Sequence, residues 1–259
     1  MNYTLPADIS IENRVRAQNI SMAIPTLSQG IPFLQIGGDF LRSKSMDRNS
    51  FDGGDWFNRV DFSMQSTNWN IGLPSQQENS AKYDQIIDIL ADSNRAPGIS
   101  DVQFAGAVFQ EFLKIRSSSQ LFRLTNATDI SDRIGFHNVG SDQTGGLIVM
   151  SIDDGTGLTD LDPAADAVVL MINGTANEVT HNIPTAAGFV LHPVLASSID
   201  SIVQTAQFTG GDESGDFTVP AYTAAVFVKP LGGSQGTGLS PFATIGTPDT
   251  APYGDTQVY

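Results

Sequence analysis

The chain has 259 residues, of which 40% are hydrophobic and 16% charged, so it holds enough apolar material to bury a core and is not disordered throughout. Its 13 lysines and arginines against 28 aspartates and glutamates give a formal net charge of −15, which argues against nucleic acids and anionic membrane surfaces as partners. Because the sequence has no cysteine, disulfide frameworks, thiolate metal sites and cysteine nucleophiles are excluded.

The first predicted unit is a helix followed at once by a strand. Residues 10–29 carry apolar side chains at helical spacing and end before Gly30, and Pro25 is predicted to kink the helix. The short apolar run 31–36 ends at two glycines, which is typical of a strand buried in a parallel sheet. Helix, short turn and buried strand form the repeating unit of an α/β sheet or barrel.

A long polar segment, residues 37–62, follows this predicted strand. It is rich in glycine, yet it contains Trp56 and several phenylalanines. A loop of this length directly after a buried strand usually has a function. In a β/α barrel it would lie at the C-terminal face, where active sites are built.

Two further helices and a set of strands are predicted downstream. A weak helical pattern covers residues 82–91, and a strong one covers residues 101–116, with Ser100 and Gln103 as its expected capping box. Four later runs are rich in β-branched and aromatic residues and are bounded by turn residues, which predicts an antiparallel sandwich. These runs are residues 146–152, 167–173, 188–192 and 223–229.

Several motifs in and around the long segment occur in one fixed order. Within it lie LRSKS (residues 41–45), RNSFD (48–52) and GDWFN (54–58). Around it lie RVR (14–16), GIPF (30–33), NIGLP (70–74), IRSSSQLFR (115–123) and NVGSDQTGGLIVM (138–150). Together they closely resemble bacterial pullulanases and plant limit dextrinases, which are α-1,6-glucan debranching hydrolases of the α-amylase superfamily. The departures are mild: Gly38-Asp39 stands where the family more often has Ser-Glu, and Phe51 and Gly53 replace a common Tyr and Ser.

The resemblance implies a fold and a domain order. The expected fold class is α/β plus all-β: the C-terminal remnant of a (β/α)8 barrel, with residues 31–36 as its eighth strand, followed by an antiparallel β-sandwich. Residues 1–116 would end the catalytic barrel and residues 117–232 would form the sandwich. Residues 233–259 have the composition of a linker and end on a β-type pattern, so we expect the start of a further module there.

The same resemblance places the catalytic groups outside this chain. Debranching is a retaining hydrolysis that needs a carboxylate nucleophile and a carboxylic acid about 5 Å apart. In the family these groups, and a supporting His-Asp-Asn motif, lie on strands that would precede Met1. None of the three histidines, His137, His181 and His192, is followed by Asp, and His137 and His181 are interpreted as surface or strand polar residues. We therefore assign no catalytic residue here.

Acidic and aromatic residues of the long segment are candidates for substrate binding by the resemblance. Asp52 lies where the superfamily places an aspartate that accepts hydrogen bonds from glucose hydroxyls; the alternative is a cap on the Gly53-Gly54 turn. Trp56 either stacks on a glucose ring or is a core aromatic that fixes the segment to the barrel, and the core role is favoured. Asp55 is a loop carboxylate that binds sugar hydroxyls or holds the loop.

Polar and basic residues complete the set. Arg42, with Lys44, either reaches sugar hydroxyls or pairs with Asp39 and Asp47, and the ion pairs are favoured because basic residues in acidic loops usually serve structure. Asn58 is expected to hydrogen-bond within the loop. The carboxylates of this loop are not expected to replace the catalytic pair, because they share one loop with no opposing wall.

Partners and cofactors follow from the same comparison of motifs. The expected partners are α-glucans such as pullulan, starch and glycogen, bound by the full-length enzyme, with no nucleic acid. No apolar run approaches the roughly 20 residues of a membrane-spanning helix, so we expect no membrane insertion. No cofactor is required; calcium occurs in the family, although the acidic run 153–162 is better explained as a solvated hairpin loop. The competing hypothesis is a non-catalytic carbohydrate-binding or structural β-sandwich module.

Overall fold

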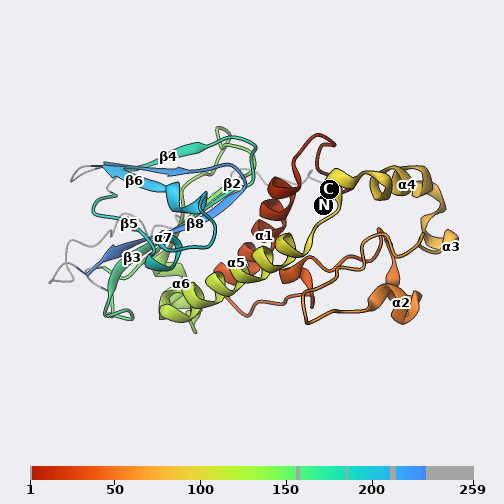
Figure 1. Ribbon diagram of the computed structural model, residues 1–259. Coiled ribbons are helices and arrows are strands. Elements are labelled where there is room, and N and C mark those ends of the chain that lie inside the picture. Colours follow the sequence, from red (N-terminus) through yellow and green to blue (C-terminus); the bar gives the residue numbers. More distant parts are fainter. Residues whose placement is uncertain (1, 156–157, 185, 211–213, 232–259) are drawn as a thin grey trace.

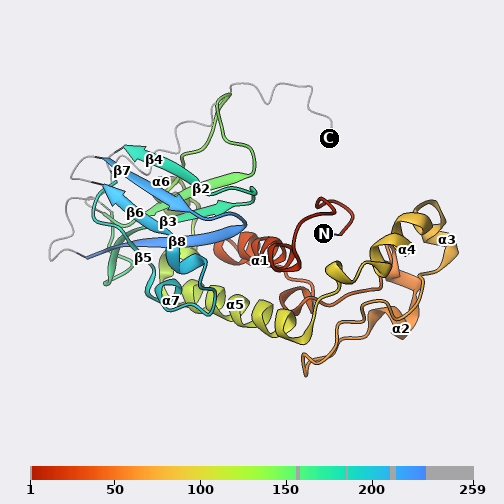
Figure 2. The same ribbon diagram turned by 45° about the horizontal axis from the view of Figure 1, so that its top comes forward.

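The computed structural model describes residues 2–155, 158–184, 186–210 and 214–231 (Figure 1). A β-sandwich occupies one end of the molecule, and short helices and loops occupy the other (Figures 1 and 2). Two long helices, α1 (Ile11–Leu27) and α5 (Ile99–Ser118), lie between these ends and pack against each other. The predicted tail, residues 233–259, lies outside the described residues.

Helices α1 and α5 begin at caps that satisfy free backbone N–H groups. At α1, Ser10 Oγ accepts a hydrogen bond from Asn13 N at 3.2 Å, as expected for an N-cap serine. At α5, the cap is Gly98, whose N–H donates to Asp101 Oδ2 at 2.8 Å. The predicted capping box of Ser100 and Gln103 is therefore wrong, because the helix starts two residues earlier and Ser100 lies in its first turn. Helix α4 (Tyr83–Ala91) confirms the weaker prediction.

The C-terminal half confirms the antiparallel sandwich. A five-stranded sheet has the order β1-β2-β3-β8-β5, and a three-stranded sheet has the order β4-β7-β6, with every pair antiparallel. Strands β2, β3, β5 and β8 correspond to the four predicted runs, whereas β1, β4, β6 and β7 were missed. The strands are β1 (Ile134–Phe136), β2 (Leu147–Asp153), β3 (Ala165–Asn173), β4 (Val179–Pro184), β5 (Val190–Leu191), β6 (Gln207–Gly210), β7 (Ser214–Val219) and β8 (Thr223–Pro230).

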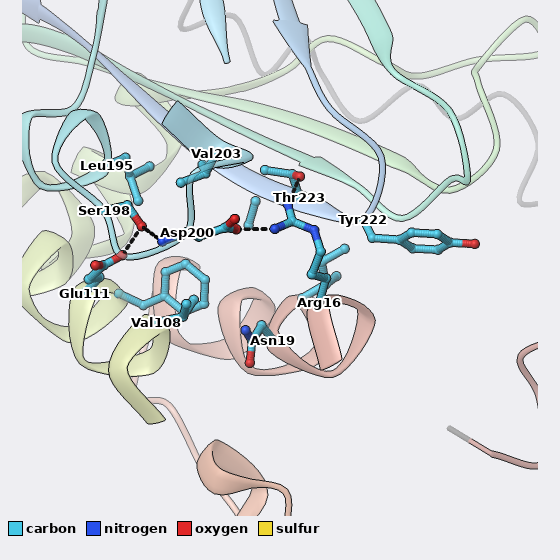
Figure 3. Close-up of a pocket in the computed structure, with 13 residues that line it drawn as sticks. Arg16, Asn19, Val108, Glu111, Leu195, Ser198, Asp200, Val203, Tyr222 and Thr223 are labelled. Atoms are coloured by element: carbon cyan, nitrogen blue, oxygen red, sulfur yellow. Dashed lines mark hydrogen bonds and ion pairs between the residues drawn. The ribbon is translucent and has the colours of Figure 1, made fainter. Parts of the chain in front are cut away.

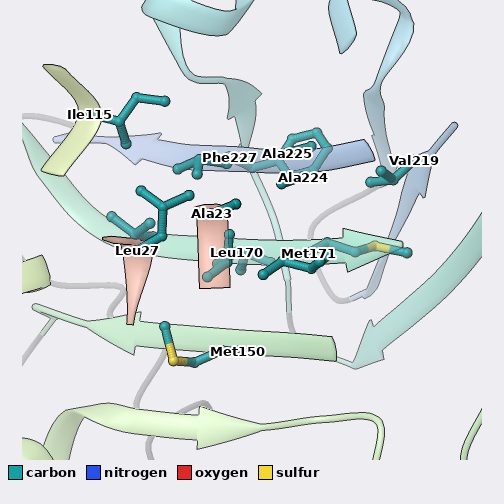
Figure 4. Close-up of a cluster of buried hydrophobic side chains, with 14 of the residues drawn as sticks. Ala23, Leu27, Ile115, Met150, Leu170, Met171, Val219, Ala224, Ala225 and Phe227 are labelled. Carbon is teal, nitrogen blue, oxygen red and sulfur yellow. The ribbon is translucent and has the colours of Figure 1, made fainter. Parts of the chain in front are cut away.

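One hydrophobic core joins the two long helices to the sandwich. Ala23 and Leu27 of α1 and Ile115 of α5 lie over strands β3 and β8, on the face of the sheet that carries Leu170 (Figure 4). The other side of this sheet packs on the small sheet through tilted and edge-on contacts among aromatic rings, which are Phe189, Phe208, Phe217 and Phe227. The core thus crosses the boundary predicted at residues 116 and 117, and the division into a barrel part and a sandwich part stays a prediction.

The structure corrects one predicted element, the buried strand at residues 31–36. This segment has no strand assignment and pairs with no sheet, and Ile31 and Phe33 are 82% and 89% exposed. A parallel strand needs a hydrogen-bonded neighbour, and the described chain places none beside it. The apolar pattern of this segment therefore has no buried environment to match it among the described residues.

The other end of the molecule is built from short helices joined by loops. Its α-helices are α2 (Gly54–Asn58), α3 (Gln76–Asn79) and α4, and two 3-10 turns, η1 (Gly38–Phe40) and η2 (Ser50–Asp52), lie in the long polar segment. Helices α6 (Ala127–Arg133) and α7 (Pro193–Ala196) belong to the sandwich side.

Candidate functional site

The long polar segment, residues 37–62, is attached to the two long helices at its start. Gly37 has φ of 85° and its carbonyl accepts a hydrogen bond from Arg42 N at 2.8 Å, which closes a tight turn. A Cβ at Gly37 would lie 2.7 Å from Arg42 Cβ, so glycine is required there. Phe40 is buried and contacts the ring of Phe62 with 6.2 Å between centroids. These contacts fix the base of the loop.

Asn58 fixes the outer part of the same loop. Its Nδ2 donates to Ser50 O at 2.7 Å and Gly54 O at 3.0 Å, and its Oδ1 accepts from Ser50 Oγ at 3.1 Å. Lys44 Nζ also donates to Ser50 Oγ, and Arg42 Nη1 lies 3.4 Å from Asn58 O. The predicted hydrogen bonding of Asn58 within the loop is confirmed.

The ion pairs predicted for the loop are wrong. The described residues form four salt bridges, and none of them includes Arg42 or Lys44. Asp47 instead accepts from Asn49 N at 3.1 Å and from Asn79 Nδ2 at 3.0 Å. The Asp47 carboxylate, which was expected to pair with a basic side chain, therefore accepts hydrogen bonds from neutral amide groups instead.

Three of the candidate sugar contacts face solvent within one stretch of five residues. Asp52 ends η2, Asp55 and Trp56 lie on α2, and all three are exposed, with Trp56 64% exposed. The favoured core position of Trp56 is therefore wrong, because α2 is a single short helix that turns the indole outward. Among the described residues the side chain of Asp52 makes no hydrogen bond, and α2 has no side-chain cap, so nothing supports Asp52 as a turn cap.

Two hollows lie along this segment. One, of about 520 Å³, is polar except for the ring of Phe51; it is lined by Lys44, Asp47, Arg48, Asn49, Ser50, Phe51 and Asn58. The other, of about 440 Å³, lies between the start of α1 and residues 35–47. Nearby, hydrogen bonds from Ser63 and Ser66 lower the pKa of Asp61 to about 2, so this carboxyl is ionised at neutral pH. The surface combines carboxylates, amides and exposed rings, which suits a polyhydroxylated ligand.

The acidic run 153–162 is built differently from the predicted solvated hairpin. Asp153 and Asp154 are each 1% exposed, and Asp154 forms a buried ion pair with Arg133. Asp154 also accepts from Leu161 N at 2.9 Å and Asp162 N at 2.7 Å. Burial raises the pKa of both aspartates. Among the described residues no cluster of three or more His, Asp or Glu side chains could hold a metal ion.

The histidines also have defined structural positions. His192 is buried and caps α7, since its Nδ1 accepts from Val194 N at 3.2 Å. His137 Nε2 lies 2.8 Å from the hydroxyl of the buried Ser151. The His137–Ser151 contact joins residues 14 positions apart through the pairing of β1 with β2, so no local pattern reveals it.

No helix in the described ranges has the length and apolar character needed to cross a bilayer.

Comparison with known proteins found one matching family model and several relatives. Residues 64–230 match the model for "Alpha-1,6-glucosidases, pullulanase-type, C-terminal". The chain is 40% identical over 234 residues to "Pullulanase 1, chloroplastic" of Arabidopsis thaliana, which covers 88% of this chain and 24% of that protein. It is 35% identical over 240 residues to the pullulanase of Klebsiella pneumoniae, which covers 92% of this chain and 22% of that protein. The chain thus spans about a quarter of the length of these relatives.

A solved structure is similar over the same range. The crystal structure of Klebsiella pneumoniae pullulanase complexed with maltotriose has a TM-score of 0.81 and 38% sequence identity to this chain. The similarity covers 92% of this chain and 22% of that one. It therefore includes the long helices and both sheets together.

Proposed function

Because the chain belongs to the pullulanase-type alpha-1,6-glucosidases, we propose that it forms one wall of the substrate cleft in a debranching hydrolase. Its β-sandwich supports that wall. The substrates of the complete enzyme are α-glucans with α-1,6 branches, such as pullulan, starch and glycogen. The observation that carries the proposal is the exposed group Asp52, Asp55 and Trp56, on a loop whose inner side is fixed by Asn58.

The chemistry of this group suits a sugar chain. An ionised carboxylate accepts shorter and stronger hydrogen bonds from hydroxyls than a neutral acceptor does. An exposed indole offers a flat apolar face with a polar edge, which matches the alternating faces of a glucose ring. Because the loop is held from inside, these side chains lose little freedom when they bind.

Bond cleavage requires groups that we do not assign to this chain. A retaining hydrolysis needs two carboxyl groups about 5 Å apart on opposite sides of the scissile bond. Asp52 and Asp55 share one exposed surface with no opposing wall, so they bind substrate and do not cleave it. The purified chain is accordingly expected to release no maltotriose from pullulan, and we assign it no required cofactor.

Binding is tested on the chain itself with maltotriose, followed by NMR. We expect chemical-shift changes in residues 48–58, weakened together by Asp52→Ala and by Trp56→Ala. The matched control is Asp142→Ala, which removes an exposed carboxylate on the sandwich side and should leave the changes intact. Shift changes confined to the sandwich would contradict the cleft-wall proposal and favour a separate carbohydrate-binding module.

One observation argues against the free-standing module. Residues 31–36 expose apolar side chains on both faces, and among the described residues their backbone accepts one hydrogen bond, from Gly38 N to Gln35 O at 3.0 Å. An independent module gains nothing from an exposed apolar segment of this kind. Within a complete enzyme the same segment would pair with neighbouring strands.

A further inference from the structure

A buried polar network ties helix α1 to the sandwich. Arg16 of α1 is 3% exposed, and its guanidinium forms an ion pair with Asp200 and donates to Thr223 Oγ1 on β8 (Figure 3). Asp200 lies in the loop between α7 and β6, where its Oδ1 also accepts from Ile202 N at 2.9 Å. Because the charges are buried and paired, the geometry of this contact is strongly specified.

The same loop is tied to helix α5. Glu111 of α5 accepts a hydrogen bond from Ser198 Oγ at 2.6 Å (Figure 3). It accepts another from Ile199 N at 2.9 Å. Ser198 Oγ in turn accepts from Asp200 N at 2.9 Å. Residues 198–200 therefore hold both long helices at once, and we call these residues the sandwich clamp.

The opposite sides of the two helices contact the start of the long polar segment, residues 37–62, which we call the candidate loop. Gln18, two positions and about 200° around α1 from Arg16, donates through Nε2 to Gly38 O at 3.2 Å. A Cβ added at Gly38 would lie 3.0 Å from Met22 Sδ, so α1 and the loop are in close contact. On α5, a Cβ at Gly106 would lie 3.9 Å from Phe40 Cβ and 3.2 Å from Cε of Met64, just beyond the segment, so glycine there admits both side chains.

We infer that the sandwich positions the candidate substrate loop through α1 and α5, with Arg16, Asp200, Glu111 and Ser198 as positioning residues. The helices lie between the sandwich and the loop in both views (Figures 1 and 2). The loop belongs to neither sheet, so its position depends on the helices beneath it. A change at the clamp is thus transmitted to Gly38 and Phe40 along rigid helices, without contact between the clamp and the loop.

Hydrogen exchange on the purified chain tests the coupling between the sandwich clamp and the candidate loop without a glucan. Only the effect of this coupling on substrate binding rests on the proposed function. The reporters are the amides of Arg42 and Ser43, which donate to Gly37 O at 2.8 Å and to Thr67 O at 2.6 Å. Asp200→Asn should accelerate their exchange about tenfold, the factor expected for one weakened charge-assisted bond. Amides of β3 and β2 should keep their exchange rates.

The control is Thr180→Val, which removes the 2.8 Å hydrogen bond between the hydroxyls of Thr180 and Thr218 inside the small sheet. It should leave exchange at Arg42 and Ser43 unchanged. Should Asp200→Asn fail to fold, Ser198→Ala is the alternative variant. It keeps the Arg16–Asp200 ion pair but removes the hydrogen bond to Glu111, so it also weakens the clamp. Unchanged loop exchange in both clamp variants would overturn the inference, and so would a uniform acceleration that Thr180→Val reproduces.

Discussion

Acid should destabilise the chain through His137, which lies directly after β1 against Ser151 of β2. Burial, and then the charge of His181 on β4, lower the pKa of His137 from 6.5 to about 4. The folded chain therefore holds this imidazole neutral at a pH where the unfolded chain already protonates it. Substituting His137 by Gln removes the titration while keeping a side chain that can hydrogen-bond to Ser151.

The sign and size of the effect follow from proton linkage. A base whose pKa is lowered by folding contributes stability that is complete above its unfolded pKa of 6.5 and is lost as the pH falls towards 4. Since one pKa unit corresponds to about 1.4 kcal/mol, the full loss is about 3 kcal/mol, of which about 2 kcal/mol falls between pH 7 and pH 5. The buried Asp153 and Asp154 have raised pKa values and act in the opposite direction at lower pH.

Urea denaturation at pH 7 and pH 5 measures this difference. The wild-type free energy of unfolding should fall by about 2 kcal/mol more than that of His137→Gln over this interval. The subtraction removes the contribution of the aspartates, which both proteins share. Equal pH dependence in the two proteins would show that His137 is solvated or that its contact with Ser151 is absent.

Three further outcomes are expected. Arg133→Met should cost about 3–5 kcal/mol of unfolding free energy because it leaves the Asp154 carboxylate buried without its cationic partner. The double variant Arg133→Met/Asp154→Asn removes that charge but keeps an oxygen that accepts from Leu161 N and Asp162 N, so it should recover part of the loss in urea denaturation. In the complete enzyme, Asp52→Ala should lower kcat/KM on branched glucan by about tenfold or more with Tm unchanged, as loss of a bond to a charged acceptor implies, and unchanged kinetics would reduce Asp52 to a turn residue. In hydrogen exchange, residues 31–36 should exchange within the dead time while β3 is fully protected; equal protection of both would show that the segment has found a partner.

Elements with continuous apolar patterns were predictable from the sequence. Strands β3 and β8 bury most of their side chains and are marked by their apolar composition, whereas helix α1 is marked by the helical spacing of its apolar residues. Strands β4 and β6 were missed because they are short, contain few apolar residues and expose much of their surface. Their pairing is decided by β7, which no local pattern links to them.

The candidate loop was predictable as a segment but not side chain by side chain. Its motifs located the region, yet the outward direction of Trp56 follows from the single turn of α2 and from the Asn58 bonds beneath it. The sandwich clamp could not be predicted from the sequence for a different reason. Arg16 and Asp200 are 184 positions apart, so their pairing exists only in the fold.

Residues 31–36 show how a local pattern can report an environment that the chain itself does not contain. The segment is held at both ends: Arg116 Nη1 donates to Thr26 O at 2.9 Å and Ser28 O at 2.8 Å, its Nη2 donates to Gly30 O at 2.6 Å, and Gln18 binds Gly38 O. The carbonyls at the end of α1 are thereby satisfied and the direction of the departing chain is set. A segment that is fixed at both ends has already lost part of its conformational entropy, so pairing with a neighbouring strand costs less. Under the proposed function, neighbouring strands of the complete enzyme would add hydrogen bonds and burial to a segment that already lies between two anchors, and the candidate substrate loop begins at the second of them.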